Sequence, residues 1–289
     1  MSRYRRILVH LSDSVRAESL LAFAARLAAE HEAELQAVHA VDSFALGAYL
    51  SPEAAMTAAA ANQTLVRERA ARARERVGHV VQALGRPIDL QVPGGDALRA
   101  MTERSRVADL VVVAQPVARD EAGPTAGFAS QLLVGAGCPV LFVPEAALTG
   151  RCGTRVQIAW ADTRESARAL RDALPILRRA EVVEVLRFGA ERDDGGEPLD
   201  GVAGYLASHD VQARCSVRAV REIPFAERML VPNVVDASIA ELLLSHAADT
   251  NADLVVMGGY GHSRAYELVL GGVTRSMLAS MTVPVLMSH

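Results

Sequence analysis

The residues best suited to chemistry are four glycines near the end of the sequence, Gly258, Gly261, Gly271 and Gly272. Two residues separate the first from the second, and nine separate the second from the third. A glycine at the carboxyl end of a strand lets the main chain approach a ligand, because no Cβ intervenes. A helix beginning near Gly272 would add unpaired N–H groups and a positive dipole end, which favour phosphate. The spacing therefore predicts a cradle for nucleotide phosphates.

Better-known phosphate motifs do not fit this segment. It has no Gly-Lys-Ser/Thr, so it is not a Walker A loop. Gly259-Tyr260-Gly261 is followed by His262 without a third glycine, so it is not a Rossmann fingerprint either. Glycines that only form tight turns are the remaining alternative. No group of Ser, His and Asp, or of Cys and His, has a spacing that predicts a catalytic site.

The elements that position this segment belong to an internal repeat. Three strings recur in the same order at nearly constant spacing: Arg6–Ser14 with Arg155–Thr163, Ala108–Val113 with Ala252–Met257, and Cys138–Val143 with Val283–Met287. We expect a first domain over 1–147 and a second over 154–289. The join between them lies near residues 144–154.

Each copy alternates between strand and helix patterns. In the first copy we expect strands at 6–11, 34–41, 88–92, 110–114 and 140–143, and helices at 14–30, 51–84, 96–106 and 126–135. Ser14 and Thr163 stand where helix N-caps belong. Such alternation predicts an α/β fold with parallel, doubly wound sheets. We expect two tandem open sheets flanked by helices and related by pseudo-two-fold symmetry, not one sheet continuous through both halves.

Composition narrows the function classes. The chain has 289 residues, of which 51% are hydrophobic and 22% charged, with a net charge of −4. This balance does not favour nucleic acid as a partner. The three cysteines form no Cys-x-x-Cys pair, so we expect no metal site and a reducing, cytoplasmic location. No apolar run approaches about 18 residues, so we expect no membrane association.

The pattern Gly-x2-Gly-x9-Gly-Ser/Thr after a Val-Val-Met strand resembles the nucleotide-binding signature of the universal stress protein family, and this sequence matches it at Gly258, Gly261 and Gly271. The strand Val283–Leu286 also looks like the family's last strand. The resemblance covers the whole chain as two fused domains. It implies a five-stranded parallel sheet in each, strand order 3-2-1-4-5, with pairing through the last strand. It further implies a stress-response regulator, acting as a homo-oligomer or an intramolecular pseudo-dimer with a protein partner still to be identified.

The resemblance also implies an adenine nucleotide, ATP or AMP, bound alone or with Mg²⁺ in the second domain. The residues it assigns to the nucleotide are Ala161, Asp162, Met257, Gly258, Gly261, His262, Gly271, Gly272, Val273 and Thr274. Gly272 departs from the family pattern because it replaces the closing Ser/Thr, although Thr274 follows two residues later. Ala161 stands where the family often has Asp, and Asp162 comes one residue late. His262 is either a phosphate-side contact or an exposed loop residue.

The first copy lacks most of the glycine signature. Ala114-Gln115-Pro116-Val117 replaces Gly-x2-Gly, and only Gly127 remains opposite Gly271. We therefore expect a non-binding first half. The segment 223–235 has no counterpart in the first copy and is a lid, a partner surface or simply a long loop.

Three functions follow, in decreasing order of support. The first is a stress-response protein that binds an adenine nucleotide in its second domain. The second is an interaction module without nucleotide, which the departures at Gly272 and Ala161 would favour. The third is a slow ATP hydrolase, which ranks last because the sequence offers no evident general base or pair of metal-binding carboxylates.

Overall fold

The fold is seen in a computed structural model, which describes residues 3–40, 52–189, 199–219, 234–260 and 272–289. The first half has the order of elements that the sequence predicts. Its elements are β1 (Arg6–His10), α1 (Ala17–His31), β2 (Glu34–Val38), α2 (Pro52–Leu84), β3 (Asp89–Gln91), α3 (Ala97–Ser105), β4 (Leu110–Ala114), α4 (Ala126–Gly135) and β5 (Val140–Val143). A short 3-10 helix, Glu145–Ala147, leads into the second half.

The second half repeats this order. Its elements are β6 (Arg155–Trp160), α5 (Arg164–Leu177), β7 (Val182–Gly189), α6 (Asp200–Ala207), β8 (Ala213–Ala219), α8 (Val234–Asp249), β9 (Leu254–Gly258), α9 (Gly272–Ser280) and β10 (Val285–Ser288). The segment 223–235 falls mostly outside the described residues. None of the helices that the structure describes is long and apolar enough to span a membrane.

The strands form a single sheet in the order β3-β2-β1-β4-β5-β10-β9-β6-β7-β8. Within each half the pairing is parallel and the order is 3-2-1-4-5, which confirms the predicted fold class. The expectation of two separate sheets is wrong, because β5 and β10 pair in antiparallel fashion and join the halves. Pairing satisfies backbone groups that each five-stranded sheet would otherwise leave open at one edge.

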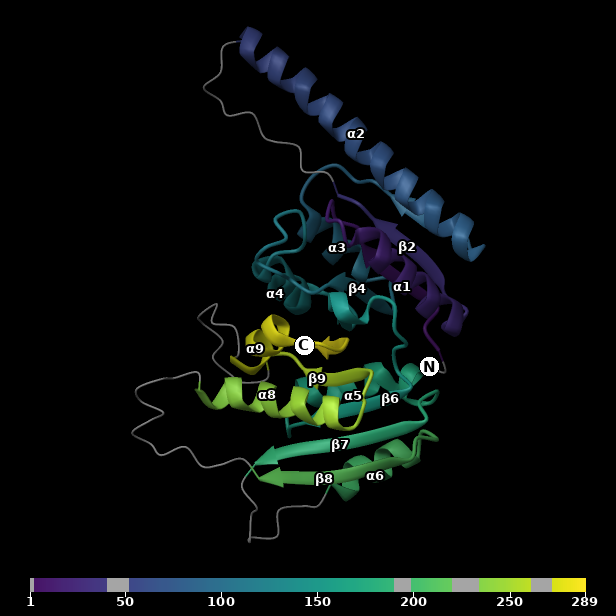
Figure 1. Cartoon of the computed structure of the whole chain (residues 1–289), viewed down its shortest axis with the longest axis vertical. Coiled ribbons are helices and arrows are strands. Elements are labelled where there is room, and N and C mark those ends of the chain that lie inside the picture. The colour runs from purple at the N-terminus through teal and green to yellow at the C-terminus, as the bar shows by residue number, and fades with distance from the viewer. Residues whose placement is uncertain (1–2, 41–51, 190–198, 220–233, 261–271) are drawn as a thin grey trace.

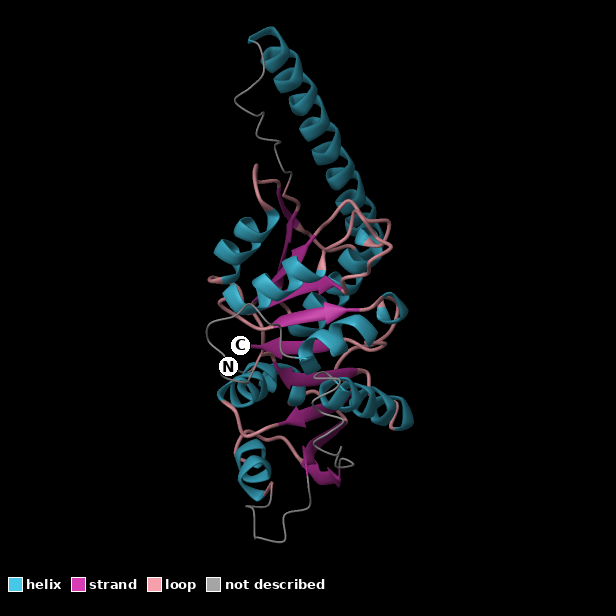
Figure 2. Ribbon diagram, turned by 90° about the vertical axis from the view of Figure 1, so that its left-hand side faces the viewer, coloured by secondary structure: helices cyan, strands magenta, loops and turns pink. Residues whose placement is uncertain are grey.

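The join is symmetric. Leu141 lies opposite Leu286, while Val140 pairs with Met287 and Phe142 with Val285. Since these strands are the corresponding last strands of the two copies, the register places a local two-fold axis between the two leucines. Figure 2 shows the strands of both halves stacked in one continuous sheet with helices on either side.

Two apolar layers cover the sheet, and each runs through both halves. One side is covered by α1, α2, α5 and α6, and the other by α3, α4, α8 and α9. The strands supply alternating residues to the two layers: Leu141 and Leu286 pack on the first side, Phe142 and Met287 on the second. The central strands are buried on both faces, as their unbroken Val and Leu runs predict. The long helix α2 projects beyond the body of the first half (Figure 1).

The helix starts agree only in part with the sequence. Thr163 caps α5 as predicted, because its side chain accepts a hydrogen bond from the N–H of Ser166. Ser14 does not cap α1, which begins at Ala17 after Arg16. Instead, the Ser14 hydroxyl accepts the N–H of Arg16 and turns toward a carboxylate far along the chain. This contact lies at the carboxyl edge of the first half, because Asp120 follows β4.

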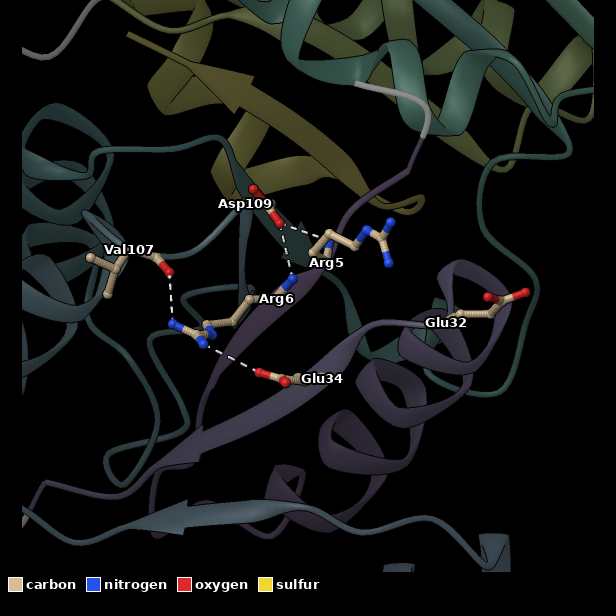
Figure 3. A pocket seen from close by; sticks show the side chains of 6 residues that line it. All are labelled: Arg5, Arg6, Glu32, Glu34, Val107 and Asp109. Atoms are coloured by element: carbon tan, nitrogen blue, oxygen red, sulfur yellow. Dashed lines mark hydrogen bonds and ion pairs between the residues drawn. The ribbon is translucent and has the colours of Figure 1, made fainter.

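The aspartate of the repeated Ala-Asp-Leu string anchors the first strand of each half. Asp109 accepts the N–H groups of Arg5 and Arg6, and Asp253 accepts those of three consecutive residues ending at Arg155. In the first half this anchor lines an open pocket of about 340 Å³, in which the side chain of Arg6 pairs with Glu34 (Figure 3). The pocket lies at the amino ends of the strands, away from the carboxyl edge where such sheets bind ligands.

Candidate functional site

The predicted nucleotide site lies where the strand order of the second half reverses. β6 lies between β7 and β9, and the loops after β6 and β9 lead to helices on opposite faces of the sheet. Ala161 and Asp162 follow β6, Met257 and Gly258 end β9, and Gly272, Val273 and Thr274 begin α9. Gly261, His262 and Gly271 lie outside the described residues. The structure thus begins a helix where the glycine spacing predicts one.

The turn between β6 and α5 is held by its own hydrogen bonds. Ser166 accepts the N–H of Ala161 with its hydroxyl, 3.1 Å away, while Thr163 caps the N–H of Ser166 at 3.2 Å. Ala161 is exposed at the edge of this turn. Its methyl group can offer a ligand only apolar contact at this position.

Two side chains that the sequence did not single out, Trp160 and Arg187, contact Asp162 beside this turn. The indole N–H of Trp160 donates to Asp162 at 3.0 Å, and the guanidinium of Arg187 at the end of β7 pairs with the same carboxylate at 3.0 Å. Asp162 is therefore already engaged by two donors, though it remains largely exposed. Trp160 is the only tryptophan in the chain. Nothing in the sequence links Arg187 to this edge, because the contact depends on the pairing of β6 with β7.

Gly258 allows a close approach of main chain to main chain. A Cβ at this position would lie 2.6 Å from the N of Ser166 and 2.8 Å from the carbonyl carbon of Glu165, so any side chain here would force β9 and α5 apart. Met257, the preceding residue of β9, is buried on the opposite face of the sheet, in the layer of α8 and α9. Gly258 therefore has a packing role at the switch point, in addition to any contact with a ligand.

The loop after β9 begins against the first half. A Cβ on Gly259 would lie 2.7 Å from the side chain of Leu133 in α4. Tyr260 has a left-handed φ of 58° and donates its N–H to the hydroxyl of Thr274 at 3.3 Å. Burial raises the pKa of Tyr260, and the nearby hydroxyl of Ser130 in α4 partly offsets this effect. Thr274 is itself buried, so its oxygen ties the start of the glycine segment to α9.

The equivalent edge of the first half contains an ion pair instead. Arg16, in the turn before α1, donates to Asp120 through Nε at 2.9 Å and Nη2 at 2.6 Å. Ser14 donates to the same oxygen at 2.5 Å, and Arg16 also reaches the carbonyl oxygen of Gln115, directly after β4. The Gln115 side chain in turn donates to the carbonyl oxygen of Leu278 in α9. The sequence gives no signal for this group, because its members are about a hundred residues apart.

The Asp120 carboxylate stays ionised at neutral pH. Burial alone would raise its pKa, but the hydrogen bonds from Ser14 and Arg16, with the charge of Arg16, outweigh burial and leave the pKa below its usual value. Among the described residues, no group of three or more His, Cys, Asp and Glu is arranged to hold a metal ion.

Comparison with known proteins assigns the family. The universal stress protein family profile matches the chain twice, over residues 3–144 and 154–289. The chain belongs to the universal stress protein family. The two matches account for the repeat seen in the sequence and confirm the tandem resemblance. No curated protein is similar enough to count as a match.

Solved structures agree with this fold. A universal stress protein from Archaeoglobus fulgidus DSM 4304 superposes with a TM-score of 0.68 over 98% of this chain and 97% of its own, at 14% identity. A protein of unknown function from Pseudomonas aeruginosa PAO1 superposes with a TM-score of 0.54 over 99% of this chain and 92% of its own, also at 14% identity. At these identities the likeness concerns the tandem fold alone.

Proposed function

We propose that the chain is a regulatory stress-response protein that binds an adenine nucleotide, ATP or AMP, at the switch point of its second half. The observation that carries the proposal is the placement of the glycine segment. It starts at Gly258, at the carboxyl end of β9, and its last glycine, Gly272, begins α9. This is the strand-to-helix arrangement in which main-chain N–H groups and a helix dipole can hold phosphate.

The roles of individual residues follow from their positions. The first N–H groups of α9, at Gly272 and Val273, would bind phosphate oxygens, and the missing hydroxyl at Gly272 would weaken that contact. Trp160 and Ala161, at the end of β6, would lie on the nucleoside side. Because the Asp162 carboxylate is held by Trp160 and Arg187, Mg²⁺ would be bound mainly by phosphate and water.

Restoring the family residue at Gly272 should strengthen nucleotide binding. The substitution Gly272→Ser adds a hydroxyl at the start of α9, where it can donate to a phosphate oxygen. A hydrogen bond to a charged group is worth roughly 1.5–3 kcal/mol, so ATP affinity should rise about tenfold or more. Calorimetric titration of both proteins with ATP measures the change.

The matched control is Gly261→Val, which adds a branched side chain within the predicted cradle and should abolish binding. Equal ATP affinity in wild type, Gly272→Ser and Gly261→Val would show that the glycines only form turns. If none of the three binds millimolar ATP, the proposal fails and a nucleotide-independent interaction module replaces it.

Two further parts of the proposal concern activity and location. We propose that nucleotide acts by changing conformation or partner choice and not through turnover. Release of inorganic phosphate from ATP at a rate that Gly261→Val abolishes would instead establish a slow hydrolase.

A cytoplasmic location is supported by the three cysteines, all of which are free thiols in the structure.

A further inference from the structure

The carboxyl edge of the first half contains a set of buried donors arranged around one anion. The side chains of Arg16 and Asp120 are only 7% and 15% exposed, and Ser14 is buried as well. Three hydrogen bonds, two from Arg16 and one from Ser14, converge on a single carboxylate oxygen, Oδ2 of Asp120. The loops after β1 and β4 form this group, at the point where the strand order of the first half reverses.

The surrounding loop is shaped to close over that oxygen. Asp120 belongs to the segment between β4 and α4, which corresponds in the repeat to the glycine segment after β9. Gly123 lies so close that a Cβ on it would be 2.6 Å from Oδ2 of Asp120 and 3.2 Å from Nη2 of Arg16. The anion position reaches the surface, since the Asp120 side chain itself is 15% exposed. A tethered carboxylate thus fills an anion position that opens toward solvent.

We propose that Ser14, Arg16 and the β4–α4 loop form an oxyanion site for phosphate, which the chain's own Asp120 occupies and keeps closed. A guanidinium fork fits carboxylate and phosphate oxygens alike. Because Asp120 is tethered, its effective concentration at the site is high, commonly millimolar or more, and free phosphate competes poorly with it. The first half is then closed by an internal anion, in addition to lacking most of the glycine signature.

The test removes the internal anion and offers an external one. Asp120→Ala leaves a buried guanidinium without its carboxylate, which is strongly unfavourable and should recruit an anion. In calorimetric titrations with inorganic phosphate, this variant should bind at least tenfold more tightly than wild type. Asp120→Asn, which fills the same space without charge, should gain much less. Glu121→Ala removes the neighbouring exposed carboxylate and should behave as wild type.

A second substitution tests whether Arg16 causes the increase in phosphate affinity. Adding Arg16→Met to Asp120→Ala should return phosphate affinity to the wild-type level. That level includes any phosphate bound by the second half, so only the difference is assigned to the first half. The inference is therefore tested independently of the nucleotide proposal. Equal phosphate affinity in folded Asp120→Ala and wild type would overturn it, as would a gain that survives Arg16→Met.

A loss of stability would not hide the result. If Asp120→Ala is partly unfolded in phosphate-free buffer, millimolar phosphate should raise its melting temperature more than that of wild type, because a ligand that binds only the folded state stabilises it. Failure of phosphate to do so would also overturn the inference.

Discussion

Lowering the pH from 7 to 4.5 is expected to remove about 2 kcal/mol of folding free energy for each of two buried histidines, His10 and His31. Burial lowers the pKa of both to about 4, helped by His39 for the first and by Arg179 for the second. Unfolded histidine titrates near pH 6.5. Between pH 6.5 and about 4 the unfolded chain therefore binds protons that the folded chain does not, so stability falls as the pH falls.

Denaturant unfolding at several pH values measures this loss. The double variant His10→Leu/His31→Leu should have a much flatter profile over this range, whereas His79→Gln, at an exposed histidine on α2, should follow wild type. Glu30 and Asp172 act in the opposite direction, because burial raises the pKa of each carboxyl. Their effect is confined to the acid end of the range, where carboxyls titrate. A wild-type profile that stays flat down to pH 4.5 would contradict the assignment.

Shortening the two leucines at the centre of the join between the halves should also lower the free energy of unfolding by a large amount. Leu141 and Leu286 lie opposite each other in β5 and β10, and neither is exposed to solvent. Leu→Ala at a buried position costs about 2–5 kcal/mol, so each single variant should lose an amount in this range. Unfolding by urea measures both variants.

The double variant distinguishes one continuous sheet from two adjacent ones. Directly opposed residues in an antiparallel pair interact, so the two losses should differ from additivity by about 0.5 kcal/mol or more. As a distant control, Leu141→Ala combined with Leu206→Ala in α6 should be additive. Strict additivity in the Leu141/Leu286 cycle would contradict the antiparallel join.

The elements within each half were predictable because local signals specify them. Runs of Val and Leu predicted the central strands, and Thr163 predicted the start of α5. The glycine spacing predicted that α9 begins at Gly272. The repeat gave the tandem organisation, which needs only the order of three strings. The strand order came from the family resemblance.

The remaining features depend on contacts that no local pattern encodes. Local patterns predicted two sheets because they do not show which edges meet. The family resemblance implied pairing through the last strand, and the register of Leu141 with Leu286 shows that this pairing joins the halves into one sheet. Ser14 looked like a helix cap, but it bonds to Asp120 in the loop after the neighbouring strand β4. Gly258 suggested a ligand, yet its nearest neighbours are the main-chain atoms of α5. The repeated Ala-Asp-Leu strings contain Asp109 and Asp253, but the sequence does not show that these aspartates bind the main chain before the first strand of each half.

If an adenine nucleotide binds at the switch point of the second half, the fluorescence of Trp160 should respond most directly when ATP is added. As the only tryptophan, at the end of β6, it reports on this edge and not on the first half. We expect its emission to change until one ATP is bound per chain. The ATP concentration at half of the change should agree with the dissociation constant from calorimetry, and the change should be absent in Gly261→Val. Emission that does not respond to millimolar ATP, while calorimetry detects binding, would place the nucleotide elsewhere and contradict the proposal, as would the absence of any binding.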